Sequence, residues 1–444
     1  MSPDAKVYTF HLKSGVKWHD GAPFTAKDVV FSFSRQIVEP YRFAKFMDAV
    51  AGAKDYKDGK ATTVTGLEAL DDTTVRVTLD APDALFLLNL SEPSNVIVPE
   101  HSLKDVKPEA IDSAPFVTKS PIGTGPYKFV QFLSDQFVEL NVNPDYFKGK
   151  PQIDKIFMKV LRPEVTVAQL ESGEVDLALR VNPGEYDRLA KVSSLSIVTR
   201  PGVGQTALNF PTEQPRVSDK RVRQAMYYAI DRKAIVQAVY QGRAKALNGA
   251  PPAMDGYADL NAYDYNPNKA RQLLQDAGFD FKAPFRIIYD QTYPAAPQYY
   301  PLIAQQLQKI GINVELVALD STAFLDRMKN KRDSFDLAGY NGGSWGLGAH
   351  ITAQYFNCKQ PGALTGYTNC AFDDLFKKAQ AIADPKQRDD LYHEAAKVYN
   401  EDVPQLPLWT ANDLHAATKR LGGGFKVSGD PRRSFTAIET WTLA

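Results

Sequence analysis

Residue types that can bind a small polar molecule gather in one glycine-rich segment, residues 339–350, which reads G-Y-N-G-G-S-W-G-L-G-A-H. The segment follows the last strand predicted for its part of the chain, and ligands of open α/β sheets bind beyond the carboxyl ends of strands. Its five glycines let backbone N–H groups approach a ligand closely. We expect Trp345 to supply an apolar platform, with hydrogen bonds from Asn341 and Ser344. The alternative is a long turn with the tryptophan packed beneath it.

Catalytic motifs are missing from the sequence. There is no G-x-S-x-G elbow, no H-E-x-x-H and no P-loop. The adjacent acids at 71–72, 373–374 and 389–390 fall in a predicted turn or at predicted solvated helix starts. We therefore expect a binding protein and no enzyme. The alternative from another class is a carbohydrate-active hydrolase with two carboxylates flanking aromatic platforms.

Composition restricts the partners. The 444 residues contain 52 Lys plus Arg and 52 Asp plus Glu, and this balance argues against a global basic field for nucleic acid. No apolar run approaches the roughly 20 residues of a membrane span. With six histidines in the chain and only His350 near the two cysteines, a Cys/His metal site is not expected. No cofactor is implied.

The two cysteines, Cys358 and Cys370, lie in a segment rich in Gly, Pro, Thr and Asn. Their spacing lets a loop close on itself, and in an exported protein we expect a disulfide. Two unrelated thiols are the alternative.

Hydrophobic periodicity predicts an α/β chain. The order strand 285–289, helix 298–310, strand 312–319, helix 322–329 and strand 335–340 is typical of a largely parallel sheet. Before it, an apolar stripe between Ser218 and Gly242 predicts one helix capped by that serine.

The most recognisable sequence segments are V-Y-T-F-H-L-K-S-G-V-K-W-H-D-G-A-P-F-T-A-K-D-V-V-F-S-F, from Val7 to Phe33, and G-T-G-P-Y-K-F, from Gly123 to Phe129. By themselves they predict a strand, a turn and a helix opened by a capping box in which Asp28 replaces the usual Glu or Gln. These two segments resemble those of the family 5 extracytoplasmic solute-binding proteins of ABC importers, and the resemblance extends over nearly the whole chain.

The resemblance implies a two-lobed α/β fold of the periplasmic-binding-protein (Venus flytrap) type with mixed sheets and lobe two inserted in lobe one. We expect lobe one at 1–200, with a small subdomain at about 20–120, lobe two at 201–405, and a return to lobe one at 406–444. The chain would then cross between lobes around 198–209 and 404–410, forming a hinge.

The function implied is capture of a polar organic solute by hinge closure and its delivery to the permease subunits of an ABC transporter. The solute could be peptide-like, an opine, an oligosaccharide or a sugar phosphate, and the protein is expected to be a monomer. Asn209 and Trp409, on the presumed crossings, and Tyr340, before the glycine-rich segment, are further candidate ligand-binding residues. Hinge packing is the alternative for the first two, and sheet core for Tyr340.

The chain departs from the family pattern at Gly348, where peptide-binding members carry an aspartate that receives the ligand's ammonium group. A buried ammonium without a counter-charge costs several kcal/mol. We therefore expect neutral or anionic ligands to bind ahead of free dipeptides and tripeptides.

The start of the chain shows no basic, apolar and small-residue pattern of a signal peptide. Family members carry a signal and further strands ahead of the segment that resembles Val7–Phe33. We therefore expect a longer natural precursor and a periplasmic location.

Overall fold

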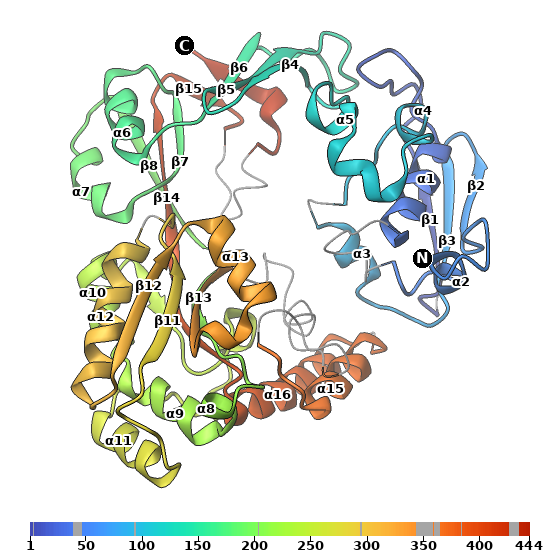
Figure 1. Ribbon diagram of the computed structural model, residues 1–444. Helices are drawn as coiled ribbons and strands as arrows, with labels where there is room; N and C mark the ends of the chain where they lie inside the picture. The colour runs from blue at the N-terminus through green and yellow to red at the C-terminus, as the bar shows by residue number, and fades with distance from the viewer. Residues whose placement is uncertain are drawn as a thin grey trace. The chain divides into compact units, whose positions relative to one another are not determined.

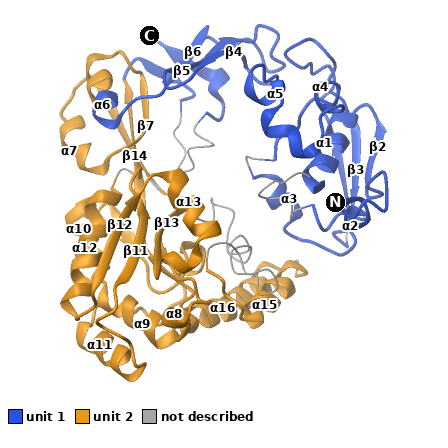
Figure 2. Ribbon diagram, in the orientation of Figure 1, with its two compact units in different colours: residues 1–166, 419–426, 435–444 blue, residues 167–418, 427–434 orange. Residues whose placement is uncertain are grey.

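The computed structural model describes residues 1–2, 4–38, 47–92, 95–202, 204–293, 295–342, 358, 365–382, 384–425 and 435–444 (Figure 1). The chain divides into two compact units (Figure 2). Unit 1 comprises residues 1–166, 419–426 and 435–444, and unit 2 comprises residues 167–418 and 427–434. Lobe boundaries at 200 and 405 stay a prediction.

Unit 1 is built on small antiparallel sheets in the orders β1-β3-β2, β4-β5-β6 and β15-β16. Its strands are β1 Val7–His11, β2 Leu67–Asp71, β3 Thr74–Thr78, β4 Tyr127–Leu133, β5 Phe137–Val142, β6 Lys155–Lys159, β15 Leu421–Gly423 and β16 Trp441–Leu443. Its helices are α1 Ala26–Val38, α2 Ala53–Lys57, α3 Phe86–Leu90, α4 Glu100–Leu103 and α5 Pro115–Thr118. Helix α6, Pro163–Ser172, spans the boundary between the units.

Half of the predicted capping box is found at the start of α1: the Asp28 side chain bonds the Thr25 N–H, while the Asp28 N–H donates to the backbone carbonyl of Thr25. The buried Asp28 carboxylate accepts hydrogen bonds from the backbone N–H groups of Thr25, at 2.8 Å, and Glu100, at 3.0 Å. The indole of Trp18 donates to the same carboxylate at 3.4 Å. Asp28 thus ties the W-H-D-G turn to the helix that follows it.

The two sequence segments that carry the family resemblance contact each other through His19. Its Nδ1 accepts from the backbone N–H of Gly123 at 3.1 Å, so Nε2 carries the proton and donates to the carbonyl of Gly125 at 3.0 Å. Desolvation by burial is the main cause that lowers the pKa of His19, which favours this neutral form. Both segments therefore stabilise the structure of unit 1.

Unit 2 holds an eight-stranded mixed sheet. Its strands are β7 Leu177–Val181, β8 Leu195–Pro201, β9 Gln205–Asn209, β10 Ala244–Ala246, β11 Phe285–Asp290, β12 Val314–Leu319, β13 Leu337–Gly342 and β14 Gln405–Thr418. Its helices are α7 Tyr186–Leu189, α8 Pro215–Ser218, α9 Lys220–Ala229, α10 Arg232–Tyr240, α11 Pro267–Asp276, α12 Ala296–Lys309, α13 Ser321–Asn330, α15 Cys370–Gln380 and α16 Pro385–Asp402.

The predicted β-α-β-α-β unit is confirmed as β11, α12, β12, α13 and β13. Strand β11 pairs in parallel with both β12 and β13, while β9 joins β13 in the antiparallel sense. Helices α9 to α12 pack against one face of this sheet in the largest apolar core, and α13 packs on the other face with Ile288 and Ala338 (Figure 1). The chain is therefore α/β with a mixed sheet.

Strand β14 joins two parts of this sheet. Its first residues pair with β9, and its last seven residues, Asn412 to Thr418, pair with β8. Strand β10 pairs with its middle residues and β7 pairs with its later ones. We call the part formed around β9, β13, β11 and β12 the lower segment, and the part formed by β7, β8 and the end of β14 the upper segment.

The single helix predicted between Ser218 and Gly242 is wrong in detail. The structure has two helices, α9 and α10, with a break at Ile230 and Asp231. Asp219 caps α9, and Asp231 caps α10 by accepting the N–H of Ala234 at 2.9 Å. The apolar stripe runs through both helices because both pack on the same core, which hides the break from periodicity.

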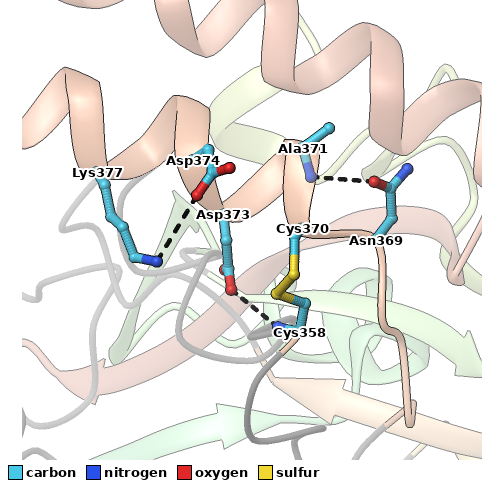
Figure 3. The surroundings of a disulfide bond; sticks show 7 residues. All are labelled: Cys358, Asn369, Cys370, Ala371, Asp373, Asp374 and Lys377. Carbon is cyan, nitrogen blue, oxygen red and sulfur yellow. Dashed lines mark hydrogen bonds and ion pairs between the residues drawn. A yellow bond between two sulfur atoms is a disulfide. The ribbon is translucent and has the colours of Figure 1, made fainter.

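Cys358 and Cys370 form a disulfide, as the sequence predicted, with their Cα atoms 5.1 Å apart (Figure 3). Cys370 is the first residue of α15, whose N-cap Asn369 accepts the N–H of Ala371. Asp373, one turn into the helix, accepts the N–H of Cys358 at 2.8 Å. The bond therefore anchors the chain at Cys358 to the start of α15.

Replacing both cysteines by serine should lower the free energy of unfolding by up to about 3 kcal/mol, because the closed loop no longer restricts the unfolded chain. Urea denaturation of oxidised wild type and of the double variant measures the difference. Reductant should destabilise the wild type and leave the double variant unchanged. Equal stability of all samples would contradict a stabilising role for the bond.

Candidate functional site

A pocket of about 170 Å³ lies in unit 2 where the upper and lower segments meet along β14. Its walls come from the end of β7, the start of β9, the end of β13, the middle of β14 and helices α10 and α12. The lining residues are Arg180, Val181, Pro183, Gly202, Gly204, Gln205, Thr206, Tyr240, Tyr293, Ala295, Tyr299, Asn341, Gly342, Ala411, Asn412, Asp413 and Leu414.

The connection between β8 and β9 lies directly against β14 at the pocket. The hydroxyl of Thr410 donates to the carbonyls of Gly202, at 3.1 Å, and Gly204, at 2.7 Å. The N–H of Gly202 donates to the carbonyl of Ala411 at 3.2 Å. A Cβ at Gly202 would overlap that carbonyl oxygen, so the close approach of the two backbones requires glycine there.

Asn341 is held at the carboxyl end of β13 by two hydroxyl groups. Its side-chain oxygen accepts hydrogen bonds from Thr206 and from Tyr299, both at 3.0 Å. The phenol of Tyr293 donates to its backbone carbonyl at 2.9 Å. Because the two hydroxyls already donate to the side-chain oxygen, the amide nitrogen is the polar end that Asn341 can offer to a solute.

The buried lining phenols remain hydroxyls at neutral pH. Burial raises the pKa of Tyr240 to about 12, and burial also raises the pKa of Tyr299. Gln205 is buried, and within the described part of the chain its Oε1 finds no hydrogen-bond donor. A solute group that reaches Gln205 would therefore gain by donating a hydrogen bond.

Arg180 has the most unusual backbone at the pocket. Its φ is 55°, a left-handed value that costs a non-glycine residue on the order of 1–3 kcal/mol. Its N–H points to Nδ1 of the fully buried His415, at 3.4 Å. Its Nε lies 3.5 Å from Oδ1 of Asp413 on the neighbouring strand.

The predicted ligand-binding residues lie in different places. Asn341 lines the pocket, whereas Tyr340 is on the opposite face of β13 with its phenol against Gly342. Asn209 and Trp409 are fully buried and are not among the lining residues. Trp409 supports the pocket from beneath, because its ring packs on Tyr240 and on Tyr299.

Ser344, Trp345 and Gly348 lie outside the described residues, so their roles stay predictions, as does ligand contact by Tyr340, Asn209 and Trp409. Sequence reasoning missed Arg180, Thr206, Tyr240, Tyr299 and Asp413. The one usable signal was the Asn412-Asp413 pair just beyond the predicted crossing at 404–410.

Comparison with known proteins decides the class. The model of the bacterial extracellular solute-binding proteins, family 5, matches residues 1–362. The chain belongs to this family. The dipeptide-binding protein of Escherichia coli K12 is 30% identical over 95% of this chain and 81% of its own length.

Two solved structures share the fold of this family 5 protein. The oligopeptide-binding protein AppA of Bacillus subtilis, in complex with a nonapeptide, has a TM-score of 0.86 and 27% identity, with 100% of this chain and 88% of that one covered. The binding protein AgaA of A. tumefaciens R10, in complex with agropinic acid, has a TM-score of 0.84 and 25% identity, with the same coverage. The periplasmic-binding-protein fold expected from the sequence is thereby confirmed.

None of the helices described in this family 5 protein is both long and apolar enough to cross a membrane. Within the same residues, no group of three or more His, Cys, Asp or Glu side chains is arranged to hold a metal ion.

Gly202→Ala should lower the free energy of unfolding by about 1–3 kcal/mol, because the new Cβ pushes the β8–β9 connection away from β14. Gly256→Ala is the matched control, since a Cβ there meets nothing within 4 Å. It should change the free energy by no more than about 0.5 kcal/mol. Equal values for the two variants, measured by urea denaturation, would refute the tight crossing.

His415 should make the protein less stable in mild acid. Burial is the main cause that lowers its pKa from 6.5 to about 4, and the charges of Arg180 and Arg200 lower it further. The unfolded chain then takes up a proton at higher pH than the folded one. The contribution of His415 to stability is thus complete above about pH 6.5 and is lost as the pH falls towards 4.

The measurement compares wild type with His415→Asn, which keeps an acceptor for the N–H of Arg180 and does not titrate. Between pH 7 and pH 5 the free energy of unfolding should fall by about 2 kcal/mol more in wild type than in the variant. Parallel pH profiles would show that His415 titrates normally.

Proposed function

We propose that this chain works as the substrate-binding component of an ABC importer, because its family consists of such components, which bind a small ligand or peptide and work with a permease. We propose that this chain captures a polar organic solute in the unit 2 pocket and closes on it about the connection at Gly202 and Thr410. The observation that carries the proposal is that one pocket is lined from both the upper and the lower segment. A solute that contacts both segments would favour the arrangement in which both contacts form.

The volume of the pocket limits what it can hold. At about 170 Å³ it is smaller than the roughly 300–1,000 Å³ that encloses a drug-sized ligand. It therefore suits one polar end group of a larger solute. A peptide-like molecule, an opine, an oligosaccharide or a sugar phosphate all remain candidates, and AppA and AgaA bind a nonapeptide and agropinic acid, respectively.

We propose that neutral or anionic solutes bind ahead of free dipeptides and tripeptides. This preference follows from Gly348 in the sequence and is supported by the donors at the pocket, the guanidinium of Arg180 and the amide nitrogen of Asn341. We further propose a monomeric protein that acts in the periplasm. The hydrolase alternative gains no support from the relatives, which are named as binding proteins.

Ligand capture should make the protein more compact. Protein purified from its own host is first weighed by native mass spectrometry, and the solute it retains is identified. Small-angle scattering then compares the stripped protein with protein saturated by that solute, which should have the smaller radius of gyration. An unchanged profile at saturation would contradict closure, and turnover of the solute would revive the hydrolase alternative.

A further inference from the structure

The side chain of Arg180 reaches the pocket from a backbone conformation that arginine rarely adopts. Among the described residues, seven other than glycine have a positive φ, and of these Arg180 alone lines the pocket. Glycine would adopt this φ at less cost, and asparagine tolerates it better than arginine does. Left-handed residues of this kind cluster at ligand-binding positions, where the surrounding structure holds them.

The surrounding strands hold Arg180 in place. Its N–H faces Nδ1 of His415, and the pairing of β7 with β14 shifts register between Leu414 and Ala416. Val181, the next residue, pairs with Leu414 and is buried. The backbone on both sides of Arg180 is thus fixed by neighbours, while its own side chain remains 46% exposed.

The contact with Asp413 does not account for this conformation. It joins Nε to one carboxylate oxygen at 3.5 Å, which is longer than the roughly 2.7–2.9 Å of a short charge-assisted hydrogen bond. Half-exposed ion pairs of this kind stabilise proteins little. A planar guanidinium can instead bind a carboxylate or phosphate through two parallel hydrogen bonds.

The charges near Arg180 favour an anion. Arg200 pairs with Asp413 in the β8–β14 register, and the charges of Arg180 and Arg200 both act on the neighbouring His415. The buried His415 is neutral at pH 7 and adds no charge. The amide nitrogen of Asn341 and the hydroxyl of Tyr240 add donors elsewhere in the same pocket.

We propose that Arg180 is the anchor for a carboxylate or phosphate group of the transported solute. In the protein without solute, the Asp413 carboxylate keeps the Arg180 guanidinium near the pocket. When the solute binds, its anionic group accepts hydrogen bonds from the guanidinium N–H groups that face the pocket. His415 acts as a positioning residue, since it accepts the N–H of Arg180 and keeps the left-handed conformation. This inference rests on the proposed function and names the chemical class that the pocket selects.

The test uses matched probes on the full chain. N-acetyl-trialanine is compared with its C-terminal amide, and glucose 6-phosphate is compared with glucose, so that each pair differs in one anionic group. Trialanine amide, a cation, tests the opposite preference. Isothermal titration with wild type should give an affinity at least tenfold higher for one of the two anionic probes than for its neutral partner, and the arm that responds distinguishes carboxylate from phosphate.

Arg180→Asn removes the charge and tolerates the left-handed backbone, and Arg180→Gly provides a second variant with no strain at all. Both should reduce binding of the anionic probe at least tenfold, to the level of its neutral partner, with thermal midpoints no lower than that of wild type. The control is Arg188→Gln, which removes an exposed arginine of α7 that pairs with Glu171 and Glu185 and does not line the pocket. It should bind as wild type does.

The remaining outcomes also decide the matter. Equal binding of the anionic probe by wild type and both Arg180 variants would overturn the anchor, and so would preference for the neutral or cationic probe. If no probe binds, the test uses the solute that the protein retains from its host. An anionic solute that wild type retains and Arg180→Asn does not retain supports the anchor. A retained solute without carboxylate or phosphate overturns it. A wild type that retains nothing and binds no probe contradicts the proposed function itself.

Discussion

The pocket depends on one constraint, that a single strand must serve two sheet segments. Strand β14 is 14 residues long and pairs first with β9 and then with β8. The pairing with β9 itself shifts register between Pro407 and Trp409, before the pairing with β8 begins at Asn412. Proline has no N–H to give to the ladder, so an irregularity at Pro407 costs the sheet little.

The geometry of that strand explains why two different kinds of residue meet at one place. The lower segment contributes side chains at the carboxyl end of β13, where parallel strands commonly present ligand-binding groups. The upper segment contributes Arg180 and Asp413, which come from antiparallel strands. Neither segment alone combines the hydroxyl-bound amide of Asn341 with a guanidinium.

Much of the lower segment was predictable from the sequence because its elements follow simple rules. Strands alternated with amphipathic helices, and three parallel strands resulted. Asn341 was predicted because it follows a strand, and it lines the pocket. Asn209 and Trp409 were predicted from their place on the crossings, but sequence alone did not show which way their side chains face. The structure buries both side chains completely.

Arg180 illustrates what sequence patterns cannot show. In L-A-L-R-V it reads as an ordinary outward-facing residue of an alternating strand. Its left-handed φ arises from pairing with β14, more than 200 residues away in sequence. A local pattern carries no information on such a long-range register shift, and no turn residue such as glycine marks the position.

The contact made by His19 has a consequence for where such a protein can work. It joins two distant turns of unit 1 through an imidazole that must stay uncharged, since one ring nitrogen accepts and the other donates. Burial lowers the pKa of His19, so its two hydrogen bonds persist to lower pH than those of an exposed histidine would. The members of this family are extracellular solute-binding proteins, so they do not work in the cytoplasm. Because His19 stays neutral as the pH of the surroundings falls, the contact between the two turns is kept in mild acid.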